Sequence, residues 1–165
     1  MLKPAKLYEE ELMMKMRETW YNPVYQFYYS SSYFSDLKLD DDSMWNFVSV
    51  DKNDEVIGLF SYHLNREINC VRNFGAISFD IGNVVFARDI RKGIDDIFRK
   101  YRFNRMEWCC IDGNPALRSY KKFCENHGGT IVAHEHECVK TLDGALRDTY
   151  TFEILARNYK GCLNE

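Results

Sequence analysis

The stretch that decides the fold is residues 74–129, FGAISFDIGNVVFARDIRKGIDDIFRKYRFNRMEWCCIDGNPALRSYKKFCENHGG. Residues 74–81 alternate in polarity, which predicts a strand. Apolar residues recur at helical spacing over 87–101, and the nearly all-apolar run 106–111 is typical of a strand buried on both faces. Strand, helix and strand in this order predict a parallel pair joined by a crossover helix.

A second helix is predicted directly after the buried strand. Asn114 and Pro115 form a start signal, because asparagine caps free amides and proline suits the first helical position. Gly128 and Gly129 form the matching stop signal. The predicted helix therefore runs from this cap through His127.

The sequence on both sides of this unit predicts antiparallel hairpins. Further strands are predicted over residues 44–50, 56–64, 130–139 and 147–155. Turn-forming residues at 51–54 and 142–144 separate the members of each pair. Upstream, residues 5–20 are predicted to form a helix that breaks at the proline of position 23, and 24–34 a second, shorter helix.

The element order predicts a mixed α+β (α/β) fold, with a central mixed sheet of about six to seven strands and helices on both faces. A length of 165 residues suits one core and is short for two. We therefore expect residues 1–165 to form a single domain. Residues 1–43 would supply the N-terminal helices and residues 44–155 the sheet.

Composition excludes several classes of protein. A formal net charge of −3 gives no general attraction for phosphate backbones, so nucleic acid is not an expected partner. None of the six cysteines forms a Cys-x-x-Cys pair, which disfavours a zinc ribbon or a thioredoxin-type motif. Cys109 and Cys110 lie in an apolar run and are predicted to be buried core thiols, which is typical of a reducing, cytoplasmic setting. No signal-peptide core follows the N-terminus and no apolar run is long enough for a membrane span.

The run from Asn114-Pro115-Ala116 through Tyr120 to Gly128-Gly129, in this element order, resembles the GNAT family of acetyl-CoA-dependent N-acetyltransferases. The resemblance extends more loosely over residues 44–155. It implies the GNAT fold, acetyl-CoA as cofactor, and transfer of an acetyl group to a primary amine of a small molecule or peptide by direct attack on the thioester. Residues 1–43 would lie on the acceptor side.

The resemblance also implies which residues contact coenzyme A. The implied contacts are the strand residues Ile77, Ser78 and Phe79, the turn and helix residues Ala87, Arg88 and Asp89, and Asn114 on the pantetheine arm. The family's pyrophosphate turn aligns with Val84, Ala87 and Asp89, and all three depart from its commonest residues. A carboxylate at position 89 would repel a pyrophosphate unless it pointed away, while Arg88 and Arg91 could compensate.

Tyr120 occupies the position where the family keeps its general acid, which protonates the departing thiolate. Its helical spacing with Phe123 and Cys124 is equally typical of a core ring. Asp80 is the first candidate for a general base, as a carboxylate in an otherwise apolar strand, and its alternative is a side chain on the solvated face. Further base candidates are His63, Glu107 and His134.

A second constellation is His134-Glu135-His136-Glu137-Cys138. Strand alternation would place His134, His136 and Cys138 on one face, and imidazoles and thiols are zinc ligands. Residues two apart on a strand are separated by about 7 Å, however, so these three could not easily share one ion. The sequence therefore favours a polar strand without a metal.

Two alternatives to an enzyme stay open. The altered turn at 84–89 is consistent with a non-catalytic GNAT-fold binding module that has a degenerate coenzyme A site and acts through a protein partner. The Asn-Pro-Ala helix could also belong to an unrelated α/β domain. The aromatic residues at 21–34 would either line the acceptor side or pack in the core. The net negative charge favours a cationic acceptor. The last predicted strands could pair with those of a second subunit, so a homodimer is possible.

Overall fold

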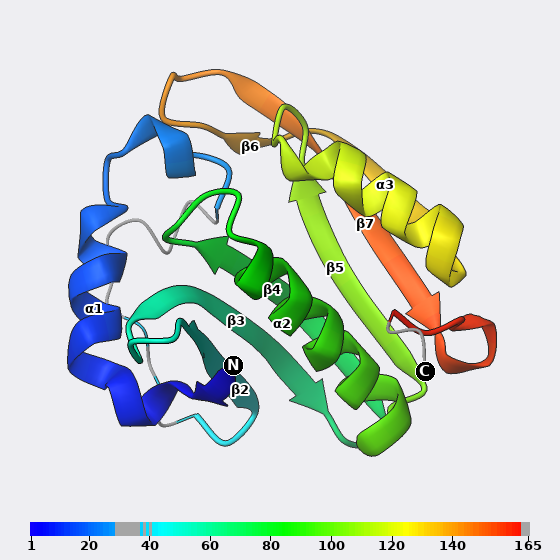
Figure 1. Ribbon diagram of the computed structural model, residues 1–165. Helices are drawn as coiled ribbons and strands as arrows, with labels where there is room; N and C mark the ends of the chain where they lie inside the picture. Colours follow the sequence, from blue (N-terminus) through cyan, green and yellow to red (C-terminus); the bar gives the residue numbers. More distant parts are fainter. Residues whose placement is uncertain (29–36, 38, 40, 163–165) are drawn as a thin grey trace.

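The computed structural model describes residues 1–28, 37, 39 and 41–162 (Figure 1). Its centre is a seven-stranded mixed sheet in the order β1-β2-β3-β4-β5-β7-β6. The strands are β1 (Leu2–Pro4), β2 (Met44–Val50), β3 (Val56–Asn65), β4 (Cys70–Ser78), β5 (Arg105–Ile111), β6 (Gly129–Lys140) and β7 (Leu146–Leu155). The helices are α1 (Glu9–Glu18), α2 (Val84–Asp95) and α3 (Ala116–His127).

Helices cover both faces of the sheet, as predicted. On one face α2 and α3 pack on a core that includes Phe60, Trp108 and Phe152 (Figure 1). On the other face α1 packs on a smaller core that includes Val48 and Leu59. Alternating side chains of β3 enter the two cores, because successive residues of a strand point to opposite faces.

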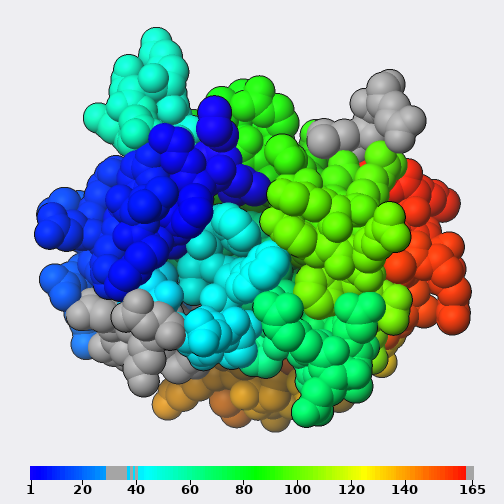
Figure 2. Space-filling view, turned by 90° about the horizontal axis from the view of Figure 1, so that it is seen from below, coloured from blue at the N-terminus to red at the C-terminus, as the bar shows by residue number. Residues whose placement is uncertain are grey.

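The N-terminal part differs from the prediction. Leu2–Pro4 forms an edge strand on β2 that the sequence analysis missed, and Figure 2 shows this segment (blue) beside the β2 region (cyan). The predicted first helix divides into a 3₁₀ turn, Ala5–Tyr8, and α1. The predicted helix at 24–34 is represented by a 3₁₀ turn at Pro23–Tyr25, and its residues 29–34 lie outside the described residues.

Two boundaries in the central unit also differ. The strand predicted over 74–81 is β4, which begins at Cys70 and ends at Ser78, so Asp80 lies in the following turn. The helix predicted to begin at Ala87 begins at Val84, because the Asn83 side chain caps its first amides. A π-helical turn ends this helix at Asp96–Lys100. No described helix is long and apolar enough to cross a membrane.

The parallel strands β4 and β5 pair only at their beginnings. Their register comprises Cys70 opposite Arg105 and Val71 opposite Met106. Beyond these pairs the two strands diverge (Figure 1), while β4 stays paired with β3 and β5 stays paired with β7. The carboxyl ends of both strands therefore border an opening in the sheet, which is where open α/β sheets bind ligands.

Candidate active site

A pocket of about 290 Å³ lies where β4 and β5 diverge. Its lining comes from β4 (Phe74, Gly75, Ala76), β5 (Cys109, Ile111), the start of α3 (Asn114, Tyr120), the last hairpin (Glu135, Cys138, Val139, Thr149) and the N-terminal segment (Phe27, Tyr28). Apolar walls with a few converging polar groups are typical of a small-molecule site. The pocket is therefore the candidate active site.

Tyr120 lines the pocket and also packs in the core, so both of its predicted roles are compatible with its position. Its ring contacts Trp108 at 5.9 Å and Phe152 at 6.0 Å between centroids. Burial raises the pKa of the phenol, with smaller contributions from Cys110 and Tyr28. The hydroxyl consequently keeps its proton at neutral pH and is able to donate it.

Asn114 lines the pocket beside Tyr120 and caps α3 as predicted. Its Oδ1 accepts a hydrogen bond from the Ala116 N–H at 2.9 Å, and Gly128 ends the helix in the left-handed conformation at φ 83°. The cap fixes the Asn114 side chain at the mouth of the opening. Its amide nitrogen is then the group that could contact a pantetheine arm.

The backbone of β4 directs toward the opening groups that neither β3 nor β5 bonds. Phe79 N–H donates to the Ile57 carbonyl, which makes 57–79 and 59–77 the hydrogen-bonded pairs with β3. Ile77 and Phe79 therefore direct their backbone groups toward β3. Ser78 and Ala76 direct theirs into the opening, so of the three strand residues predicted to contact coenzyme A only Ser78 offers its backbone, joined by Ala76, which the sequence analysis missed.

The turn between β4 and α2 is closed by side chains. Asn83 Oδ1 accepts from the N–H groups of Val85 and Phe86, and Asn83 Nδ2 donates to Asp80 at 2.7 Å. Ala87 lies inside the first turn of α2, with its N–H bonded to the Asn83 carbonyl. Three amides of the first turn, those of Val85, Phe86 and Ala87, are thus already bonded to Asn83 rather than open to a pyrophosphate.

Arg88 and Asp89 of α2 point to different surroundings. The Arg88 side chain is 66% exposed, and its Nε lies 3.9 Å from Asp89 Oδ1. Asp89 is buried, accepts from Ser49 Oγ at 2.7 Å and lies 2.6 Å from the Met1 amino group. Its carboxylate borders a separate hollow of about 250 Å³ beside β1 and β3. Asp89 therefore points away from the opening and would not contact a cofactor seated there.

None of the four predicted base candidates lines the pocket. Asp80 is exposed and engaged with Asn83, and Glu107 is paired with Arg105. His63 lies on β3 opposite Met44, and His134 bonds Asp148 on the outer face of the last hairpin. The expectation that Asp80 sits in the strand beside the thioester is wrong, because β4 ends two residues earlier.

Glu135 is the carboxylate that the sequence analysis missed. It lines the pocket and accepts from Thr149 Oγ1 at 3.1 Å, and Thr149 Oγ1 lies 3.0 Å from Cys138 Sγ. Strand alternation in the sequence already placed Glu135 on the face of the strand opposite to His134, and this pattern could have identified it as a pocket residue. A register shift between Glu135 and Val139 then turns Cys138 to the pocket as well, so its predicted grouping with the histidines is wrong.

The adjacent cysteines of β5 have different environments, although both were predicted to be core thiols. Cys110 is buried, and burial raises the pKa of its thiol to about 12. Cys109 is exposed, lines the pocket and lies 3.4 Å from Thr151 Oγ1. The prediction holds for Cys110 alone.

Similarity to known proteins is found at the level of structure. No protein-family model and no curated protein matches the sequence. A spermidine N-acetyltransferase from Vibrio cholerae in complex with CoA and spermine superimposes with a TM-score of 0.73 at 18% identity, over 96% of each chain. A spermidine/spermine N-acetyltransferase from the same organism, in complex with manganese ions, gives 0.60 at 20% identity, over 72% of this chain and 68% of that one. The expected GNAT fold is thereby confirmed.

Proposed function

We propose that this chain is an acetyl-CoA-dependent N-acetyltransferase that acts on a primary amine of a small molecule or peptide. The observation that carries the proposal is the protonated phenol of Tyr120, which lines a pocket at the opening between β4 and β5. The V. cholerae structure that covers 96% of this chain is an N-acetyltransferase in complex with CoA. Residues 1–165 would act as one domain, with the cofactor site within 44–155 and residues 1–43 on the acceptor side.

The residues of the opening fit the chemistry of acetyl-CoA. Ala76 and Ser78 direct their backbone groups toward the place of a pantetheine arm, Asn114 adds a side-chain amide, and the exposed Arg88 guanidinium, 3.9 Å from Asp89, adds positive charge for a phosphate. Bound acetyl-CoA would supply the acetyl group as an activated thioester.

Within this site Tyr120 and Glu135 have complementary roles. Glu135 attracts the cationic form of the acceptor and takes its proton, which exposes the nucleophilic lone pair of the nitrogen. Tyr120 donates its phenolic proton to the sulfur that leaves, and the proton that the attacking nitrogen loses when the amide forms restores the phenol. A carboxylate in the pocket, together with the net charge of −3, favours a cationic acceptor such as a polyamine or a basic peptide.

The cellular setting that we propose is the cytoplasm. All six cysteines are free thiols, among them the exposed Cys109 and Cys138. Exposed free thiols persist in a reducing compartment.

A non-catalytic binding module is the second candidate function, and it rests on the closed turn before α2. Asn83 occupies the amides of Val85 and Phe86, and the Asp80 carboxylate lies beside this cap. A negative charge there opposes a pyrophosphate.

One experiment separates the two functions. Acetyl-CoA is titrated into the protein by calorimetry, and acetylated products and free CoA are then quantified chromatographically with spermidine, a basic peptide and an acidic peptide as acceptors. Chromatography avoids interference from the protein thiols. Binding followed by amine-dependent product supports the acetyltransferase, and binding without product with any acceptor supports the module. No binding at millimolar acetyl-CoA would overturn the acetyltransferase proposal.

A further inference from the structure

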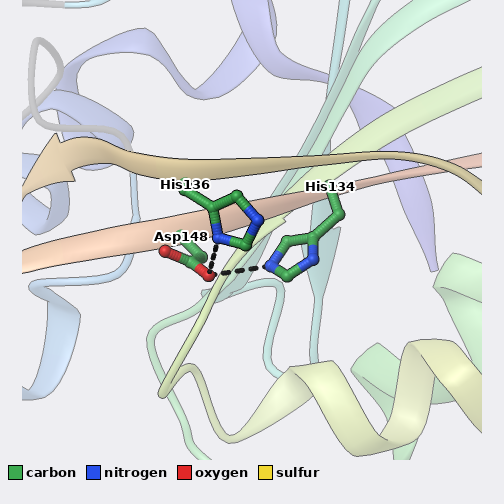
Figure 3. Close-up of side chains that lie close together, drawn as sticks. All are labelled: His134, His136 and Asp148. Carbon is green, nitrogen blue, oxygen red and sulfur yellow. Dashed lines mark hydrogen bonds and ion pairs between the residues drawn. The ribbon is translucent and has the colours of Figure 1, made fainter.

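Two histidines and an aspartate converge on the outer face of the last hairpin (Figure 3). His134 and His136 lie on β6 and Asp148 lies on β7. Asp148 Oδ2 is 2.8 Å from His134 Nε2 and 3.0 Å from His136 Nδ1. The three ligand atoms lie within 4.8 Å of one another.

A bulge in β6 brings the two histidines close enough to share one ion, which a regular strand would not easily allow. The register with β7 shifts between Glu135 and Val139, and Glu137 takes a left-handed backbone conformation at φ 50°. A bulge bends its strand and redirects the neighbouring side chains. As a result the rings of His134 and His136 lie side by side, 4.4 Å apart between centroids.

Surrounding groups hold the ligands in place. The Glu137 N–H donates to Asp148 Oδ1 at 2.9 Å, which leaves Oδ2 directed at the imidazoles. The His134 ring stacks on Tyr150 at 4.3 Å with an interplanar angle of 11°. Such supporting contacts are characteristic of metal sites.

We propose that His134 Nε2, His136 Nδ1 and Asp148 Oδ2 form a site for a divalent transition-metal ion of the Zn²⁺ type. Two imidazoles and a carboxylate are a known ligand set for this ion, with water in the remaining position. Ligands about 2.0–2.2 Å from a tetrahedral ion lie roughly 3.3–3.5 Å from each other. The present N···O separations are a few tenths of an ångström shorter, so a small rotation of exposed side chains admits the ion.

The site is separate from the candidate active site. Glu135, between the two histidines, points to the opposite side of β6 and lines the pocket. An ion bound by β6 and β7 would cross-link the bulge to its neighbouring strand. We therefore assign the ion a structural role in the hairpin, independent of the proposed acetyl transfer.

The test uses the full chain freed of metal with EDTA. Zn²⁺ is titrated by calorimetry into the wild type and into His134→Gln, His136→Gln and Asp148→Asn, and the last variant keeps an acceptor for the Glu137 N–H. Matched controls are His63→Gln, a histidine on β3, and Glu137→Gln, a carboxylate of the same bulge. We expect one ion per chain in the wild type and in both controls. Each ligand variant should bind at least about 10–100-fold more weakly, because even supporting contacts contribute that much.

Cobalt substitution tests whether a thiolate is among the ligands. The Co²⁺ protein should lack the near-ultraviolet band of a thiolate ligand, which would instead appear if the exposed Cys138 or Cys109 held the ion. Circular dichroism verifies that each variant is folded. The proposal is overturned by a thiolate band, by undiminished Zn²⁺ affinity in the folded ligand variants, or by a wild type that binds no Zn²⁺.

Discussion

At the scale of single residues, position relative to the opening decides which polar groups could act. Tyr120 and Asn114 were expected at the site from local sequence, and both line the pocket. Asp80 and Asp89 were expected there too, but one is in an exposed turn and the other is buried against Ser49. Which way a side chain points depends on an exact strand end or helix start, and sequence patterns locate these ends only approximately.

Replacing Tyr120 by phenylalanine removes the proposed acid and keeps the ring that packs on Trp108. We expect turnover to fall about 10²–10⁴-fold, the usual contribution of general acid help. Acetyl-CoA affinity and melting temperature should change little. Tyr101→Phe, which alters a ring packed on Trp45 away from the pocket, serves as the control. Unchanged turnover would remove Tyr120 from the mechanism.

The wild-type pH profile offers a further check on Tyr120. Burial raises the pKa of this phenol above its ordinary value of about 10, so the acid form persists as the pH rises through that value. Turnover should therefore show no loss that depends on Tyr120 up to about pH 10. A decline at lower pH in the wild type that is absent from Tyr120→Phe would contradict the assignment.

Replacing Glu135 by glutamine tests its proposed contact with a cationic acceptor. The KM for the amine should rise about fivefold, because a partly solvated ion pair contributes about 1 kcal/mol. The KM for acetyl-CoA should stay the same, while turnover should fall because glutamine cannot take the proton of the amine. Glu137→Gln is the matched control, since Glu137 belongs to the same bulge and does not line the pocket. Equal KM values for the amine in the two variants would exclude Glu135 from acceptor binding.

At the scale of elements, the sequence features that predicted the structure correctly are those that act over a few residues. Asn114 caps α3 and Gly128 ends it, as their residue types predicted, because each makes its contact within a few residues. The bulge of β6 escaped prediction, because Glu137 is not a residue type that favours positive φ. The cap at Asn83 was also missed, although its residue type is that of Asn114.

Gly128 gives a test of how α3 joins β6. Its φ is 83°, and a Cβ at this position would overlap the carbonyl oxygen of Asn158. Gly128→Ala should therefore lower the free energy of unfolding by at least about 2 kcal/mol, the sum of backbone strain and overlap. Gly144→Ala, at the same φ but in open space, should cost only the strain of about 1–2 kcal/mol. Equal losses in the free energy of unfolding, measured with denaturant, would show that Asn158 moves aside at no cost in stability.

At the scale of the whole molecule, one core joins two parts of a divided sheet. Phe60 of β3 belongs to the same core as Trp108 of β5 and Phe152 of β7, although β4 and β5 share only two register positions. The sequence predicted the parallel pair from its strand–helix–strand order. It could not predict where the pairing stops, because register between strands about 30 residues apart is set by packing of the assembled core.

The divided sheet makes a specific prediction for acetyl-CoA binding. A cofactor seated between β4 and β5 would receive hydrogen bonds from the N–H groups of Ala76 and Ser78, which point away from β3, so their hydrogen exchange should slow on binding. Val71 is already paired with Met106 and is the internal control. At 100 times its dissociation constant the ligand should stabilise the fold by about 2.7 kcal/mol, which at roughly 2–4 °C per kcal/mol raises the melting temperature by roughly 5–11 °C. Stabilisation without slower exchange at Ala76 and Ser78 would mean that acetyl-CoA binds elsewhere on the molecule.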